Sequence, residues 1–217
     1  MAFTFVVDEL GDPVRLTTRV EAESGKGYSH PEAHAVMFGP DGRILISTRG
    51  DKRFLRHIRT ILSAGGHIDG RDVYPNEIGN LKGKEIEGKV YLDYVHGVAR
   101  ETNEELGTKI LPNRFKRIMK SNFDFTDLCN YPNYGYIEVY SVRYDPKTDG
   151  KIKPNKSEIE KVEWLSLEDI RKREIHKTLG RLGERVFNEI EPISNEIRRE
   201  KSAVISVAKL RHRKSVI

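Results

Sequence analysis

The sequence predicts an α+β fold, a sandwich of sheet and helix that carries a helical extension at its C-terminal end. Three observations support this: strand-like runs fill residues 3–68, an amphipathic helical pattern covers 91–106, and further strands precede a helix-prone end. The chain has 217 residues, 37% of them hydrophobic, which is enough for one sizeable core with an appendage.

The N-terminal third is expected to form two β-hairpins. The β-rich runs FTFVVDEL and VRLTTRVEAE flank a Gly-Asp-Pro turn at residues 11–13. Two clearer apolar strands lie within AHAVMFGPDGRILISTR, residues 33–49, and flank a Gly-Pro-Asp-Gly turn. A basic loop, RGDKRFLRHIR, follows at 49–59. The next run, TILSAGGHI at 60–68, indicates a strand that leads into a double glycine.

A helix is expected in the middle of the chain, after a long polar segment. Residues 70–89 are polar, contain glycines and show no periodicity, so we expect a long loop or an insertion. From about Tyr91 to Leu106 the pattern is helical, and Gly107 suits the C-cap. The mostly apolar stripe of this helix comprises Val95, Val98, Ala99, Thr102 and Leu106.

The second half is expected to return to strands before it becomes helical. FKRIMKSNFDF and YGYIEVYSVRY indicate two strands joined by a turn-rich segment at 126–133. DPKTDGKIKPNKSE is expected to be a loop, and EKVEWL a short strand. SLEDIRKR then opens a helix with a capping-box pattern from Ser166 to Asp169.

The C-terminal residues 176–217 are helix-prone and basic, and Pro192 is expected to break the helix. We therefore divide the chain into a domain over 1–175 and a basic helical extension over 176–217. A packed appendage is the favoured role of the extension, while a nucleic-acid arm and a dimer contact stay open.

Composition and charge exclude several classes of protein. The formal net charge of +5 is compatible with nucleic acid, phosphate-bearing small molecules or an acidic surface, and selects none of them. The single cysteine, Cys129, excludes an intrachain disulfide. No signal-peptide pattern opens the chain, and no window approaches the ~18 apolar residues of a membrane span. We expect a cytoplasmic protein without a membrane partner.

The predicted helix carries a cluster of acidic residues. Glu101, Glu104 and Glu105 lie at positions i, i+3 and i+4, so their carboxylates project from one side, away from the apolar stripe. Like charges at this spacing repel. A divalent cation such as Mg²⁺ would remove this repulsion, and it takes carboxylate oxygens together with substrate phosphates. Upstream, Gly65 and Gly66 would let the backbone approach a ligand closely. A solvated helix face is the alternative.

Three segments of the chain resemble sequence features of a known family. RETNEELGT resembles the second half of the Nudix signature, GGHIDG is similar to its first half, and EKVEWLSLEDI is similar to the segment that often closes these domains. The resemblance covers roughly residues 4–175. It implies a Nudix-like α/β/α sandwich with a mixed sheet. It also implies hydrolysis of a diphosphate linkage in a nucleoside diphosphate derivative or another organic diphosphate, with Mg²⁺ or Mn²⁺. The partner would be this small molecule rather than nucleic acid, and a homodimer stays open.

The resemblance also implies roles for individual residues. Arg100 would brace the catalytic loop, and Glu104 or Glu105 would activate water. The metal ligands implied are Glu101, Glu104, Glu105 and the Gly66 carbonyl, with Glu138 as a further candidate for metal or base. The chain departs from the signature in one respect. Gly66 and Arg100 are much farther apart than usual, so residues 70–89 would be an insertion. The isolated first glutamate has no secure match, and Asp72 is the nearest by count.

The N-terminal half most resembles the isopentenyl-diphosphate isomerase branch of the same superfamily. His30, Arg49, Arg53 and His67 stand where that branch has its histidines and basic residues, and they are candidates for substrate-phosphate binding. The cysteine of the isomerases is replaced by Gly65. Since isomerisation needs an acid and a base on opposite faces of the alkene, the hydrolase is favoured. A catalytically silent Nudix-fold binding module and an isomerase-like enzyme are the alternatives.

Overall fold

The computed structural model describes residues 3–24, 26, 28–50, 57–74, 91–129 and 132–214. Its main element is a seven-stranded sheet in which five strands follow the order β11-β4-β3-β10-β9, while β5 pairs with β4 and β6 pairs with β3. The strands are β3 (Ser29–Phe38), β4 (Ile44–Arg49), β5 (Arg59–Thr60), β6 (Ala64–His67), β9 (Lys116–Asp124), β10 (Tyr134–Arg143) and β11 (Ile159–Leu165).

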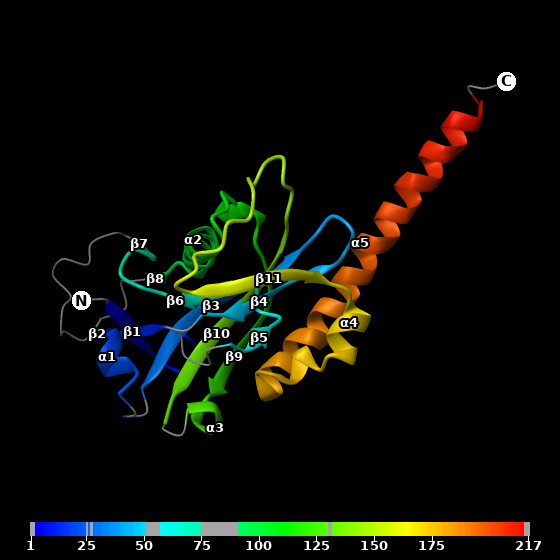
Figure 1. Cartoon of the computed structure of the whole chain (residues 1–217). Coiled ribbons are helices and arrows are strands. Elements are labelled where there is room, and N and C mark those ends of the chain that lie inside the picture. Colours follow the sequence, from blue (N-terminus) through cyan, green and yellow to red (C-terminus); the bar gives the residue numbers. More distant parts are fainter. Residues whose placement is uncertain are drawn as a thin grey trace.

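The sheet is mixed, and helices cover both of its faces. The central strands β3 and β10 are parallel, whereas the other pairings are antiparallel. Helix α2 (Tyr94–Leu106) covers one face, and α4 (Leu167–Lys172) with the first half of α5 (Gly180–Lys214) covers the other (Figure 1). Each face has its own buried apolar cluster. The predicted α+β sandwich with a mixed sheet is therefore confirmed.

The first predicted hairpin is present but shorter than expected. β1 (Phe3–Val7) pairs antiparallel with β2 (Pro13–Thr18), and the residues that follow form a short helix, α1 (Arg19–Ala22), instead of continuing the strand. The strand ends because the Thr18 hydroxyl accepts a hydrogen bond from the Glu21 N–H at 3.1 Å, which caps the helix. The Thr4 hydroxyl donates to the Ile68 carbonyl, so the hairpin is tied to the segment after β6.

The second hairpin, β3–β4, is confirmed, but the predicted strand at 60–68 is two strands. β5 and β6 are separated at 61–63, and the two glycines lie inside β6 rather than after it. Next along the chain, the short strands β7 (Val73–Tyr74) and β8 (Tyr91–Leu92) pair antiparallel. Most of the expected insertion at 70–89 lies outside the described residues.

The central helix and the later strands agree with their predictions. α2 ends at Gly107, whose φ of 66° is left-handed, and Val98, Ala99, Thr102 and Leu106 of the predicted stripe are buried. β9 and β10 form an antiparallel pair, joined through the short α3 (Thr126–Cys129). The capping box that opens α4 is present, with Asp169 N–H donating to the Ser166 hydroxyl at 3.1 Å. Two 3₁₀ turns, η2 (Pro112–Arg114) and η3 (Ile175–Lys177), complete the elements.

The predicted break at Pro192 is wrong. α5 is one continuous helix of 35 residues with Pro192 inside it. Packing on both sides of the proline holds the helix together, since Ile190 and Ile197 are buried in the core and the Ser194 hydroxyl donates to the Gly42 carbonyl at 2.6 Å. The C-terminal end of the helix extends away from the rest of the molecule (Figure 1). None of the described helices combines the length and apolarity that crossing a membrane requires.

Candidate active site

Helix α2 lies close to the sheet because the strand residues that it packs against are small. Its buried Val98, Ala99 and Leu106 pack in one cluster with Ala33 of β3 and Ala64 of β6. Alanines on the strands bring the helix axis near the backbone of β6. Glu101 and Glu105, on the same helix, reach the double glycine of β6.

Glu105 is the most deeply placed of the three predicted glutamates. Its side chain is buried, with 4% of the residue exposed, and its Oε2 accepts a hydrogen bond from the Gly65 N–H at 3.0 Å. This contact joins the last turn of α2 to the middle of β6. A backbone donor is a favourable partner for a buried carboxylate, because the bond to an ionised acceptor is stronger than a neutral one.

Glu101 lies directly over Gly66. A Cβ atom built on Gly66 would be 3.0 Å from Glu101 Oε2 and 3.1 Å from its Cδ. Any side chain at position 66 would therefore displace the carboxylate. The glycine supplies the space in which Glu101 approaches the strand backbone, whereas the expected close approach of this backbone to a ligand stays a prediction.

Glu104 occupies a different environment. Its side chain is 51% exposed and lies 3.3 Å from both the Arg71 and the Arg100 guanidinium groups. Glu101 and Glu105 thus face the sheet, whereas Glu104 stands at the solvent edge of the same helix.

Arg100 connects the helix to the loop after β6. It holds Asp72 through two hydrogen bonds, from Nε to Oδ1 at 3.0 Å and from Nη2 to Oδ2 at 2.6 Å. It also donates to Glu101 Oε1 at 2.6 Å and to the His67 carbonyl at 3.3 Å. Burial opposes its charge, but these acidic partners raise the pKa of Arg100 overall. Asp72, the nearest match to the missing first glutamate, is a partner of the arginine here.

Glu138 is buried on β10, with its oxygens already engaged. It accepts from the Arg117 guanidinium at 3.0 Å and from the Tyr140 hydroxyl. Burial, and then the bond to Glu138, raise the pKa of Tyr140. Glu138 is the cross-strand neighbour of Ala33, so it points to the same side of the sheet as α2.

The predicted phosphate-binding residues fall in different places. Arg53 lies outside the described residues. Arg49 ends β4 and is half-buried, and alternation from the buried Leu45 places it on the side of α2. His30 and His67 come together, with stacked rings whose centroids are 4.7 Å apart. Both, however, lie on the opposite face of the sheet from α2.

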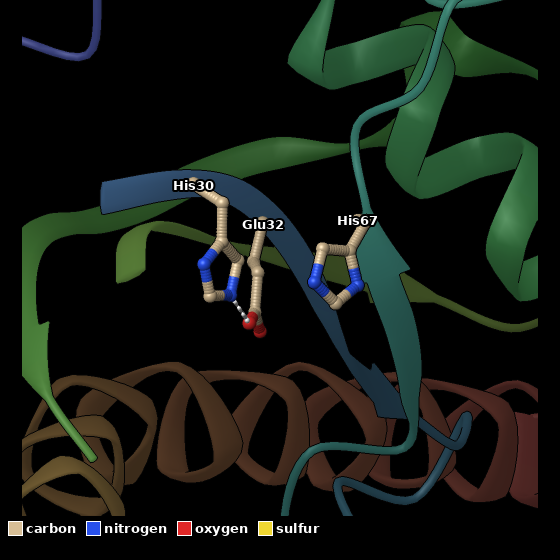
Figure 2. Close-up of side chains that lie close together, drawn as sticks. All are labelled: His30, Glu32 and His67. Carbon is tan, nitrogen blue, oxygen red and sulfur yellow. Dashed lines mark hydrogen bonds and ion pairs between the residues drawn. The ribbon is translucent and has the colours of Figure 1, made fainter. Parts of the chain in front are cut away.

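This second face holds a cluster of histidine and carboxylate side chains that was not predicted from the sequence. His30, Glu32 and His34 alternate along β3. His67 of β6 is the cross-strand neighbour of Glu32, and Figure 2 shows it beside His30 and Glu32. Burial works against the charge of Glu32, but hydrogen bonds from His30 and His34 hold its pKa well below the ordinary value. Burial also holds the pKa of His67 well below its ordinary value. The pattern His-x-Glu-x-His, read at the strand period of two, was the available signal.

Among the described residues, one group of three metal-ligating side chains has all its ligand atoms within 4.8 Å of one another, and it is His30, Glu32 and His67. The three glutamates of α2 do not meet this criterion, in keeping with the different surroundings of Glu104.

Comparisons with known proteins find one family model that matches part of this chain, together with several similar structures. A family model described as NUDIX domain matches residues 86–185. Among solved structures, DR0079 from Deinococcus radiodurans aligns with a TM-score of 0.55 and 16% identity, over 87% of this chain and 99% of that one. A MutT NUDIX hydrolase from Burkholderia pseudomallei aligns with a TM-score of 0.42 and 21% identity, over 64% of this chain and 83% of that one.

At identities of 16% and 21%, structural similarity shows the fold alone. Of these two, only the alignment with DR0079, with its TM-score of 0.55, supports a shared fold. A search of curated proteins found no match. The matched segment includes Arg100, all three glutamates of α2 and Gly107. The NUDIX domain model thus matches residues 86–185 of this chain, a little less than half of its length.

Proposed function

We propose that this protein is a metal-dependent hydrolase of the Nudix type, which cleaves a diphosphate linkage in a nucleoside diphosphate derivative or another organic diphosphate. One observation carries the proposal: α2 is seated so that Glu101 lies over Gly66, Glu105 accepts from the Gly65 N–H, and Arg100 ties the helix to the loop after β6. A merely solvated acidic face would have no reason to be built against a strand in this way.

Mg²⁺ or Mn²⁺ suits these donors. Both ions accept carboxylate and carbonyl oxygens, and the missing Cβ of Gly66 leaves room for the Glu101 carboxylate at the strand. Glu101, Glu104 and Glu105 would hold the ion, and the Gly66 carbonyl would add an oxygen. Such an ion, when bound, neutralises phosphate charge and lowers the pKa of a coordinated water.

The other roles fall to residues around the helix. Either Glu104 or Glu105 would accept the proton of the attacking water, and Arg100 would position both the helix and the loop after β6. Glu138 is a further candidate for metal or base, although its bonds to Arg117 and Tyr140 would first have to open. Arg49 and Arg53 are the proposed phosphate contacts. His30 and His67 suit phosphate less well, because the Glu32 carboxylate beside them would repel it.

The test is product formation from a panel of organic diphosphates, with Mg²⁺ or Mn²⁺ and with a chelator. Wild-type protein should cleave at least one compound, only when metal is present. Glu105→Gln should lose this activity, whereas Glu189→Gln, a matched change on the exposed side of α5, should keep it. Binding of the panel without any product would favour the catalytically silent module instead.

A further inference from the structure

The face of the sheet opposite α2 carries a compact set of nitrogen and oxygen donors. His30 Nε2 lies 3.0 Å from Glu32 Oε1, and His34 Nε2 lies 2.7 Å from Glu32 Oε2. His67 faces them from β6, and the three labelled side chains point toward one another (Figure 2). Two adjacent, hydrogen-bonded strands supply the whole set, so its backbone is rigid.

The hydrogen bonds within this set leave buried nitrogen atoms unsatisfied. His67 Nε2 is buried and has no hydrogen-bond partner among the described residues, although Glu23 Oε1 lies 3.2 Å away. His30, of which 1% is exposed, likewise has a buried Nδ1 without a hydrogen-bond partner in that part of the chain. Native proteins rarely bury polar atoms in this state, and a metal ion can accept the lone pair of a buried imidazole nitrogen.

We propose that His30, Glu32 and His67 bind a divalent first-row transition-metal ion, with Zn²⁺ as the best fit, and that Glu23 completes the site beside His67. Imidazole nitrogen suits Zn²⁺ and its neighbours in the series, and a carboxylate oxygen completes a common protein donor set for these ions. The buried Glu32 carboxylate and the ion would offset each other's charge.

The distances allow this with small side-chain rotations. The ligand atoms of the three residues lie within 4.8 Å of one another. Around a tetrahedral zinc ion with bonds of about 2.0–2.2 Å, neighbouring ligand atoms are roughly 3.3–3.6 Å apart. The bond from His34 to the second Glu32 oxygen would orient the ligating carboxylate, as residues around metal sites usually do.

This site is separate from the proposed hydrolytic site. A Cβ on Gly66 would meet Glu101, whereas a Cβ on Gly65 would come within 2.6 Å of His34 Nδ1, so successive residues of β6 face the two different sites. The transition-metal ion would therefore be additional to the Mg²⁺ or Mn²⁺ proposed at α2, and its binding can be tested without any substrate.

The experiment is a titration of full-length, chelator-treated protein with Co²⁺, a visible probe for zinc sites, in buffer with millimolar Mg²⁺. We expect one equivalent to bind with the visible absorption of a nitrogen-ligated, low-coordinate ion, and Zn²⁺ to displace it. Glu32→Gln and His67→Ala should each weaken binding at least about tenfold. His96→Ala, a matched change in a side chain that is 65% exposed, should have no effect.

Glu101→Gln distinguishes the two sites, because it alters the α2 carboxylates and should leave the cobalt spectrum intact. Circular dichroism checks that each variant folds, and the isosteric Glu32→Gln keeps the test valid if His67→Ala does not. The proposal is overturned if the wild type shows no such absorption. It is also overturned if Glu32→Gln leaves the absorption unchanged, or if Glu101→Gln abolishes it.

Discussion

Replacing Arg100 with methionine should destabilise the protein, because Asp72 would then keep a buried negative charge without its main partner. The two side chains are joined by two hydrogen bonds, and they are 15% and 3% exposed. Methionine keeps the apolar stem of arginine and removes only the guanidinium. The change therefore isolates the ion pair from the packing of α2.

The expected loss can be worked out from these contacts. Removing one partner of a buried ion pair costs about 3–5 kcal/mol of unfolding free energy. Asp72 retains a hydrogen bond from the Asp69 N–H at 3.0 Å, which favours the lower end of that range. A loss of about 3 kcal/mol would lower the melting temperature by about 6–12 °C in a domain of this size.

Urea unfolding in the presence of chelator measures this loss directly. Asp72→Asn in the Arg100→Met background should restore part of the stability, since no unpaired charge remains, with a coupling energy of about 1–3 kcal/mol. Arg71→Met is the matched control. Its side chain is 62% exposed and pairs with Asp69 and Glu104, so about 0–1 kcal/mol should be lost. A loss below about 1 kcal/mol for Arg100→Met, or strictly additive single changes, would refute this reasoning.

Three further predictions concern the strand–helix pair and the segment beside it. Glu105→Gln should lower metal-dependent hydrolysis at least about 100-fold without lowering metal-free stability, since glutamine can still accept from Gly65; activity within about twofold of wild type would remove the glutamate from the metal site. Replacing residues 76–89 with a short turn should keep cooperative unfolding, because β7 and β8 already pair antiparallel; a broad melting transition would place part of the core there. Gly65→Ala should lower the free energy of unfolding by more than about 2 kcal/mol, because a Cβ at position 65 would lie 2.5 Å from the Ala33 carbonyl oxygen. Gly150→Ala should lower it by only about 1 kcal/mol, because a Cβ at position 150 meets no other atom; equal losses for the two variants would contradict this reasoning.

Local patterns in the sequence predicted most of the elements. The α2 helix followed from its apolar period and its C-terminal glycine, and α4 from its capping box, because each signal is complete within a few neighbouring residues. The β3–β4 hairpin followed in the same way from its turn residues. The order of strands around β3, including its parallel pairing with β10, required the structure.

Longer-range packing decided the cases where sequence reasoning failed. Pro192 removes one hydrogen bond from α5, but the buried residues on both sides of it outweigh this local preference, and no local pattern reports them. The partnership of Arg100 with Asp72 joins residues 28 positions apart, so spacing alone could not assign it. The phosphate-binding role of His30 and His67 was implied by the resemblance to the isomerase branch and stays a prediction, whereas the sheet face on which they lie depends on strand register, which no local pattern reports.

The two glycines of β6 show how one short strand can serve two sites. Gly66 leaves room for Glu101 on the face of α2, and Gly65, with a φ of 142°, lies against His34 on the other face while its N–H donates to Glu105. A cysteine at position 65, as the isomerase branch requires, would force its Cβ into the backbone of β3 in a conformation that L-residues rarely adopt. The same geometry that argues against isomerase chemistry thus brings the α2 carboxylates and the histidine cluster to opposite sides of a single strand. A change at Gly65 should disturb both sites, and a change at Gly66 mainly the α2 site, whereas a change in Glu101 or Glu32 should disturb only its own.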